Sequence, residues 1–121
     1  MTWNIFHIPE NNIIHIETEG EMTAKMVNGM VREAMEAGER HNSGLFLVDH
    51  RKVHIAMSVL DTFSRPSELD ALSFPRNSRV AQLYAEKDHE TFQFLETVSL
   101  NRGYQIRIFK DINLAREWLS S

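Results

Sequence analysis

The residues whose types could together do chemistry lie near one another in the middle of this sequence. Asp49 and His50 directly follow the apolar run Leu45–Val48, and His54 and Ser58 come a few residues later. A carboxylate, an imidazole and a hydroxyl are the groups of a serine hydrolase, in which the histidine takes the serine proton and the carboxylate orients the histidine. The stretch has neither a Gly-x-Ser-x-Gly elbow nor an oxyanion-hole signature. We therefore assign no catalytic residue and expect that the protein is not an enzyme.

Histidine and aspartate side chains could instead bind a metal ion. Asp49, His50 and His54 offer oxygen and nitrogen ligands, but their spacing is helical whereas the segment is typical of a loop. His7 and His15 could face each other across a predicted hairpin, although isolated surface histidines are commoner. The sequence has no cysteine, which excludes thiolate ligands and disulfides. We expect no metal and no other cofactor.

The strongest evidence for a binding role of Asp49, His50 and Arg51 is their position in the predicted sheet. They stand at the predicted carboxyl end of a central strand, where open α/β sheets bind ligands. In the simpler interpretation, Asp49 caps the next turn while His50 and Arg51 are solvated. We expect a buried strand to reach the surface here, with its charged end as the rim of a ligand or partner surface.

Ser58 is placed to cap a helix that begins at Val59. A phosphate on this serine would gain from the free N–H groups and the dipole of the helix N-terminus. An unmodified capping serine is the commoner case. We include Ser58 in the candidate surface and leave its phosphorylation open.

The first half of the chain predicts a hairpin, a helix and a central strand. Two runs rich in β-branched residues, Trp3–Ile8 and Ile13–Thr18, flank the turn residues "PENN" and predict antiparallel pairing. Thr23 is a good N-cap for a long amphipathic helix, whose apolar residues recur at three- and four-residue spacing up to "HNSG". The run Leu45–Val48 predicts a strand that is buried on both faces of a sheet.

The second half predicts alternating strands and helices. Pro66 should interrupt the helix that Ser58 caps, and leave "SRPSELDALSFP" as a short helical turn and loop. The later elements are a strand at Arg79–Ala85, a helix from Asp88 to Gly103, a strand at Tyr104–Phe109 and a helix after Asp111. This order predicts an α/β fold in which a mixed sheet of about five strands is flanked by about four helices. Residues 1–121 form a single domain in this interpretation.

Methionines form a stripe on the first long helix. Met22, Met26 and Met30 repeat every fourth residue, so they share one helix face. Methionine fills irregular cores and also suits adaptable binding surfaces. Both interpretations stay open, and Met26 and Met30 are candidate surface residues.

The segment around Pro66 is rich in apolar residues. Phe63, Leu69, Leu72 and Phe74 either pack in the core, or cover an apolar cavity as a lid, or form a dimer contact. We include all four in the candidate ligand or partner surface.

Charge and composition exclude several classes of function. The net charge of −4, from 17 acids against 13 bases, repels phosphate backbones, and Arg76, Arg79, Arg102 and Arg107 are scattered without aromatic interleaving. We therefore expect no nucleic-acid partner.

No apolar run approaches the ~18 residues of a transmembrane helix, and the N-terminus lacks the features of a signal peptide. These observations favour a cytoplasmic protein without membrane insertion.

The second half of the chain resembles the bacterial SpoIIAA-like family, a branch related to STAS domains. The most specific likeness lies in "NRGYQIRIFKDINLAREWL". The family has a helix that ends at an Arg-Gly pair, a strand that ends in Phe, and a last helix with an Ala and a Trp-Leu pair. The matching residues here are Arg102-Gly103, Phe109, Ala115 and Trp118-Leu119.

The resemblance implies a binding module without catalytic residues. Relatives of this fold act as partners in anti-sigma-factor switches or, more remotely, as lipid-carrying CRAL-TRIO domains. The anti-sigma antagonists carry an Asp-Ser pair followed closely by Gly after the central strand, whereas this chain reads "VDHRKVHIAMS". Only Asp49 matches, so the serine of the phosphoswitch is absent from that turn.

We expect a protein-interaction or regulatory domain that uses apolar surface on its first two helices and forms a homodimer. The alternative is a carrier of a small apolar or lipid ligand, held between the second helical segment and the sheet.

Overall fold

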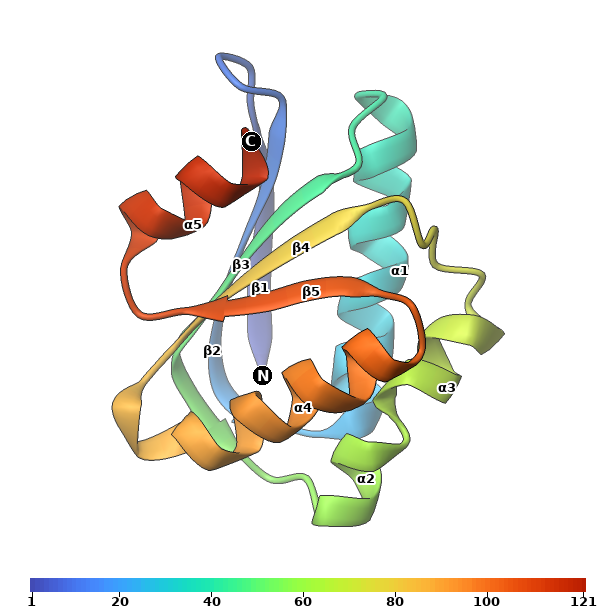
Figure 1. Ribbon diagram of the computed structural model, residues 1–121, viewed down its shortest axis with the longest axis vertical. Coiled ribbons are helices and arrows are strands. Elements are labelled where there is room, and N and C mark those ends of the chain that lie inside the picture. The colour runs from blue at the N-terminus through green and yellow to red at the C-terminus, as the bar shows by residue number, and fades with distance from the viewer.

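A five-stranded sheet organises the computed structural model, which describes residues 1–121 (Figure 1). The strands are β1 (Thr2–Ile8), β2 (Ile13–Met22), β3 (Leu45–Ile55), β4 (Arg79–Tyr84) and β5 (Gln105–Phe109), and they lie side by side in this order. Strands β1 and β2 are antiparallel, and every other neighbouring pair is parallel. The expected hairpin and the expected mixed sheet are both confirmed.

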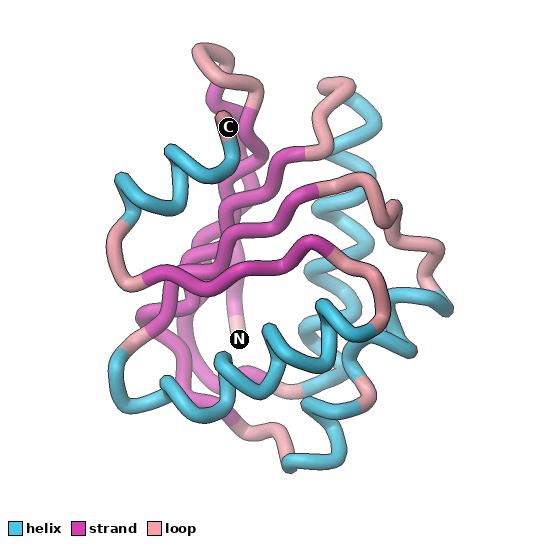
Figure 2. The backbone as a smooth tube through the Cα atoms, in the orientation of Figure 1, coloured by secondary structure: helices cyan, strands magenta, loops and turns pink.

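Helices cover both faces of the sheet. They are α1 (Ala24–Arg40), α2 (Val59–Phe63), α3 (Arg65–Ala71), α4 (His89–Asn101) and α5 (Ile112–Leu119), with a short 3₁₀ helix η1 (Glu86–Asp88) before α4. Figure 2 shows α5 alone on one side of the strands and the other helices on the opposite side. No helix combines the length and the apolar character that crossing a bilayer requires.

Local signals place most helix ends as expected. Thr23 accepts a hydrogen bond from the first turn of α1, and Asp111 accepts two from the first turn of α5. Ser58 caps α2 in a reciprocal capping box. Gly103 follows α4 with a φ of 85°, a conformation that favours glycine. Asp88 precedes α4 as expected, but its side chain makes no capping hydrogen bond.

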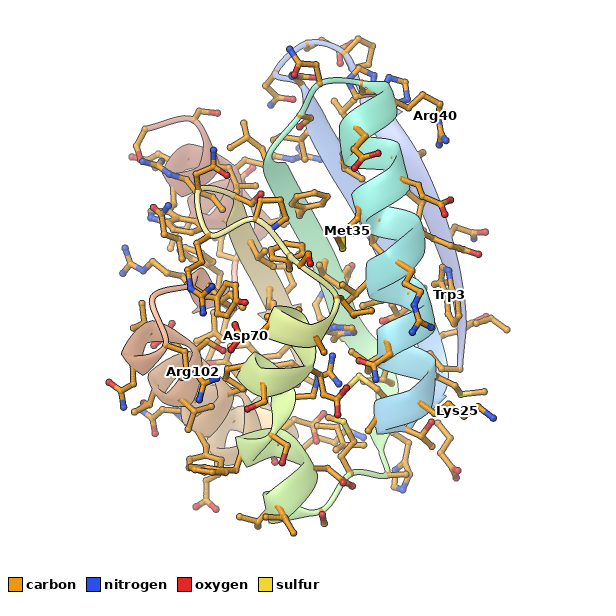
Figure 3. The ribbon with its side chains drawn as sticks, turned by 90° about the vertical axis from the view of Figure 1, so that its right-hand side faces the viewer. Trp3, Lys25, Met35, Arg40, Asp70 and Arg102 are labelled. Atoms are coloured by element: carbon orange, nitrogen blue, oxygen red, sulfur yellow. The ribbon has the colours of Figure 1, made fainter.

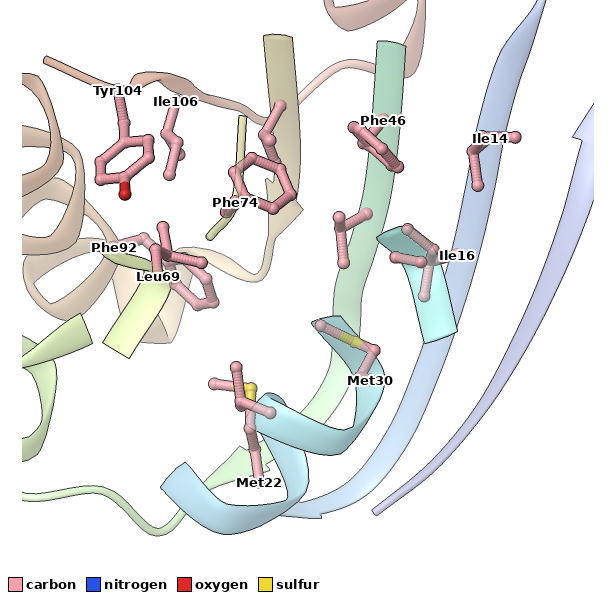
Figure 4. Close-up of a cluster of buried hydrophobic side chains, with 14 of the residues drawn as sticks. Ile14, Ile16, Met22, Met30, Phe46, Leu69, Phe74, Phe92, Tyr104 and Ile106 are labelled. Carbon is pink, nitrogen blue, oxygen red and sulfur yellow. The ribbon is translucent and has the colours of Figure 1, made fainter. Parts of the chain in front are cut away.

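Two cores lie on the two faces of the sheet. The larger core packs α1, α3 and α4 on the sheet and includes Ile14, Phe46 and Phe92 (Figure 4). The smaller core lies under α5 and includes Ile13 and Leu47. Because neighbouring side chains of a strand point to opposite faces, Phe46 and Leu47 contribute to different cores. The expectation that the central strand is buried on both faces is confirmed.

Strand β3 is longer than the sequence predicts. The chain from Asp49 to Ile55, which we expected to be a loop, continues the strand because β2 also extends and pairs Gly20 with Val53 and Met22 with Ile55. The pairing satisfies the backbone N–H and C=O groups of this polar segment. Local composition did not reveal it, because the partner lies about 30 residues away in the chain.

The helix that Ser58 caps is interrupted next to Pro66 as expected, because α2 ends at Phe63 and α3 begins at Arg65. The helical turn that follows is longer than expected, since Pro66 lies in the first turn of the seven-residue helix α3. In a first turn the missing N–H of proline has no intrahelical partner to lose, so the residue favours a helix start.

Candidate functional site

An apolar cavity lies between α1, α3, α4 and the sheet, in the larger core. Its volume is about 80 Å³, and 15 of the 19 residues that line it are hydrophobic. Four of the candidate residues line this cavity: Met30, His50, Leu69 and Phe74. Figure 4 shows Met30 of α1, Leu69 of α3 and Phe74 of the loop after α3 in the same cluster. The larger core therefore encloses space that its side chains do not fill.

Three polar residues in the cavity wall are buried and have side-chain atoms without a hydrogen-bond partner. Arg65 is 4% exposed, Gln82 is 9% exposed and Ser99 is fully buried. Arg65 Nη1, Gln82 Oε1 and Ser99 Oγ have no hydrogen-bond partner. Most buried polar groups in proteins are paired, because an unpaired one loses its hydration without compensation. Three of the residues that line the cavity therefore each have a buried polar atom without a partner within the protein.

Arg65 is the first residue of α3, and its guanidinium group forms no ion pair. The nearby carboxylates are engaged elsewhere: Glu68 Oε2 accepts a hydrogen bond from Asn28 at 3.3 Å, and Asp61 Oδ2 accepts one from the Ser58 N–H at 3.1 Å. Burial lowers the pKa of Arg65 from its usual value, and the attraction of Glu68 and Asp61 opposes the shift. An arginine remains charged in proteins, so the cavity wall carries a buried cation.

His50 also faces the cavity and is held by Thr18. The distance from His50 Nδ1 to Thr18 Oγ1 is 2.7 Å, and the same hydroxyl donates to the Asp49 carbonyl oxygen at 2.8 Å. Because the single hydroxyl hydrogen goes to that carbonyl, Nδ1 must donate to Thr18 and Nε2 carries the lone pair. Burial lowers the pKa of His50 to about 4, with Asp49 opposing the shift. His50 is therefore neutral at pH 7.

Asp49 and Arg51 lie on the other face of the sheet. They form an ion pair, in which Arg51 donates to the two carboxylate oxygens of Asp49 at 2.9 and 2.8 Å. Burial favours the neutral carboxyl, but the hydrogen bonds from Arg51 outweigh it and lower the pKa of Asp49. The pair lines a polar surface pocket together with Glu17 and Lys52. The charged rim expected from the sequence is thus split between two faces.

The groups of the hydrolase hypothesis do not meet. Asp49 and His50 are separated by the sheet, and Ser58 is exposed at the start of α2. The Ser58 hydroxyl accepts a hydrogen bond from the Asp61 N–H at 3.0 Å. No group of three His, Asp or Glu side chains is placed to hold a metal ion.

The two hairpin histidines point to opposite faces, so the alternative in which they face each other across the hairpin is wrong. His15 stacks on Phe6, with ring centroids 4.6 Å apart, whereas His7 stacks on His41 at 4.0 Å. The register pairs His15 with Phe6 and His7 with Ile14, which places the two imidazoles on different faces.

Helix α2 presents apolar side chains to solvent. Val59, Leu60 and Phe63 are 76%, 71% and 60% exposed. Phe63 stacks on Phe94 of α4 with 6.5 Å between ring centroids and does not line the cavity, contrary to the expectation for a pocket residue. Leu72, at the end of α3, is half-buried and also lies outside the cavity.

The methionine stripe is divided between core and surface. The expectation that Met22 lies on the long helix is wrong, because it is the last residue of β2 and precedes α1. Met22 and Met30 are buried and line the cavity, whereas Met26 is 39% exposed. The Met26 sulfur instead accepts a hydrogen bond from the N-terminal amine at 3.1 Å.

Hydrogen bonds of Asp70 connect α3 to the C-terminal end of α4, and the sequence provided no signal for this cluster. Its carboxylate accepts hydrogen bonds from Arg76 at 2.6 Å, from Arg102 and from the Tyr104 hydroxyl. Figure 3 labels Asp70 and Arg102, which lie close together. The Tyr104 and Arg102 hydrogen bonds lower the pKa of Asp70 to about 2. Burial and the bond to Asp70 raise the pKa of Tyr104 to about 12. Arg76 and Arg102 are exposed, but they are not scattered as expected, because both pair with Asp70.

Sequence reasoning missed Arg65, Gln82 and Ser99 as cavity residues. Gln82 had a signal, because it is a polar residue inside a strand of otherwise buried apolar residues. Arg65 and Ser99 had none, since a polar residue on a helix is ordinarily solvated.

Comparison of the chain with family models, with curated proteins and with solved structures found no match.

Proposed function

We propose that this protein is a non-catalytic binding domain that holds a small, mainly apolar ligand in the cavity beneath α3. The observation that carries the proposal is the apolar cavity whose wall contains the unpaired polar atoms of Arg65, Gln82 and Ser99. Ligand sites in proteins typically combine such a largely apolar lining with a few polar groups that orient the ligand. The element order and the residues Arg102-Gly103 and Phe109 support membership of the SpoIIAA-like family of bacterial, cytoplasmic binding modules.

The cavity volume restricts the ligand to a small molecule. At about 80 Å³ it is roughly half the size of a ~150 Å³ cavity that accepts benzene. A long fatty acid would enter only if the covering helices moved. Helix α2 is the element suited to move, because it is five residues long and exposes Val59 and Leu60, while Asp70 anchors the other end of α3.

Ligand binding is tested by filling the cavity. Ala34 lines it from α1, so Ala34→Leu should occupy the space, whereas Ala71→Leu adds the same atoms at an exposed position of α3. Native mass spectrometry of freshly purified wild-type protein should reveal a bound small molecule. Ala71→Leu should retain it and Ala34→Leu should lose it. An unliganded wild-type mass, with no thermal stabilisation by small apolar probes, would refute the proposal.

A second candidate function is protein docking on α2, including homodimer formation. The exposed side chains of Val59, Leu60 and Phe63 support it, because exposed apolar clusters mark interaction sites. Light scattering should then give a dimer mass for the wild type and a monomer mass for Leu60→Lys. A monomeric wild type that captures no specific partner would remove this candidate.

A further inference from the structure

Arg65 carries a charge that nothing in the protein neutralises directly. Its side chain is 4% exposed, it forms no ion pair, and Nη1 has no hydrogen-bond acceptor. A buried charge without a partner is strongly unfavourable, and a partner of opposite charge removes most of that penalty. Because Arg65 lines the cavity, the missing partner can be supplied from within it.

The shape and charge of the cavity wall restrict the chemical class of the ligand that can pair with Arg65. The planar guanidinium group matches a carboxylate with two parallel hydrogen bonds. The other lining residues include no second cation and are mostly hydrophobic, so a dianion such as phosphate would bury one charge unpaired. The remainder of the ligand must be apolar and short, because the volume is about 80 Å³.

We propose that the cavity binds a short aliphatic monocarboxylate, with Arg65 as its counter-ion. The inference rests on the proposed function and adds the charge and the class of the ligand. Ser99 Oγ, which is buried and unpaired in the same wall, is available as an additional hydrogen-bond donor.

The test compares two probes of nearly equal shape, sodium propionate and propionamide, with sodium chloride as the control for ionic strength. Binding is followed by NMR shifts of cavity residues and by thermal unfolding. Propionate should bind wild-type protein and raise its melting temperature, and propionamide should bind roughly tenfold more weakly or worse. Arg65→Met should lose this preference, whereas Arg32→Met, which removes the same charge from an exposed position of α1, should keep it.

A second readout separates a ligand-binding arginine from a structural one. Without ligand, Arg65→Met should be at least as thermally stable as the wild type, because an unpaired buried charge has been removed. If Arg65→Met does not fold, Arg65→Gln provides the same comparison of the two probes. Lower stability of a folded, ligand-free Arg65→Met would indicate an internal partner for Arg65 and overturn the proposal.

The binding outcomes distinguish this inference from the proposed function. If propionamide binds as well as propionate, and Arg65→Met binds both normally, the cavity is a ligand site but the carboxylate inference is wrong. If wild-type protein binds no small apolar probe of either kind, the proposed function itself fails.

Discussion

Asp49 and His50 are neighbours in β3, yet their side chains lie on opposite faces of the sheet. Asp49 pairs with Arg51 at a polar surface, and His50 enters the larger core and bonds to Thr18. The alternation of a strand separates adjacent residues in this way. The polar group that appears continuous in the sequence is therefore two groups with different surroundings, of which only His50 belongs to the cavity.

His50 should make stability depend on pH. The unfolded chain takes up a proton at this histidine near pH 6.5, but the folded protein does so only near pH 4. The neutral imidazole therefore contributes stability above pH 6.5, which is lost as the pH falls towards 4. The loss should be roughly 3 kcal/mol of unfolding free energy. Denaturant unfolding across this pH range should show a shallower pH dependence for His50→Phe than for the wild type. Equal slopes would contradict the prediction.

Asp70→Asn should loosen α3 without unfolding the domain. The substitution removes the negative charge that Arg76 and Arg102 share, while the amide retains one acceptor oxygen. Hydrogen exchange should become faster in α3 and at the start of β5, and remain unchanged in α1. Glu36→Gln, at an exposed position of α1, is the control for the change in charge. Unaltered exchange in α3 would show that this ion-pair cluster does not anchor the helix.

Two glycine substitutions should have opposite effects. Gly103→Ala forces alanine into a φ of 85°, so we expect a loss of about 1–2 kcal/mol of unfolding free energy. This loss comes from the backbone, because the new Cβ would meet Arg76 only at ordinary contact distance. Gly29→Ala in α1 places a Cβ 3.5 Å from the Trp3 ring and removes a poor helix former, so we expect a gain of roughly 0.5–1 kcal/mol. Chemical denaturation measures the change in unfolding free energy for each variant. Changes of the same sign in the two variants would refute the prediction.

Leu69→Ala should enlarge the cavity and lengthen the acids that it accepts. Leu69 lines the cavity, whereas Leu119 is buried in the core under α5. Each truncation to alanine should cost about 2–5 kcal/mol of unfolding free energy. Only Leu69→Ala should shift the preferred chain length of bound monocarboxylates upward, as measured by NMR titration with acids of increasing length. The same chain-length preference in both variants would contradict the assigned position of the ligand.

Features that depend on nearby residues were predictable from the sequence. The caps at Thr23, Ser58 and Asp111, the helix end at Gly103 and the alternation in the hairpin each involve groups within one or two turns of chain. Their physical causes, which are satisfaction of free N–H groups and access to positive φ, act locally. The α/β class followed from the order of these elements.

The candidate site depended on contacts between distant parts of the chain. The extension of β3 required pairing with β2, and the Asp70 cluster joined α3 to Arg102 and Tyr104 more than 30 residues away. Arg65 is charged whatever its surroundings, and only the tertiary packing around α3 removes it from water. The sequence by itself determined which residues could carry charge and where helices and strands begin. Tertiary packing decided which charge is buried without a partner, because burial depends on every element that covers the residue.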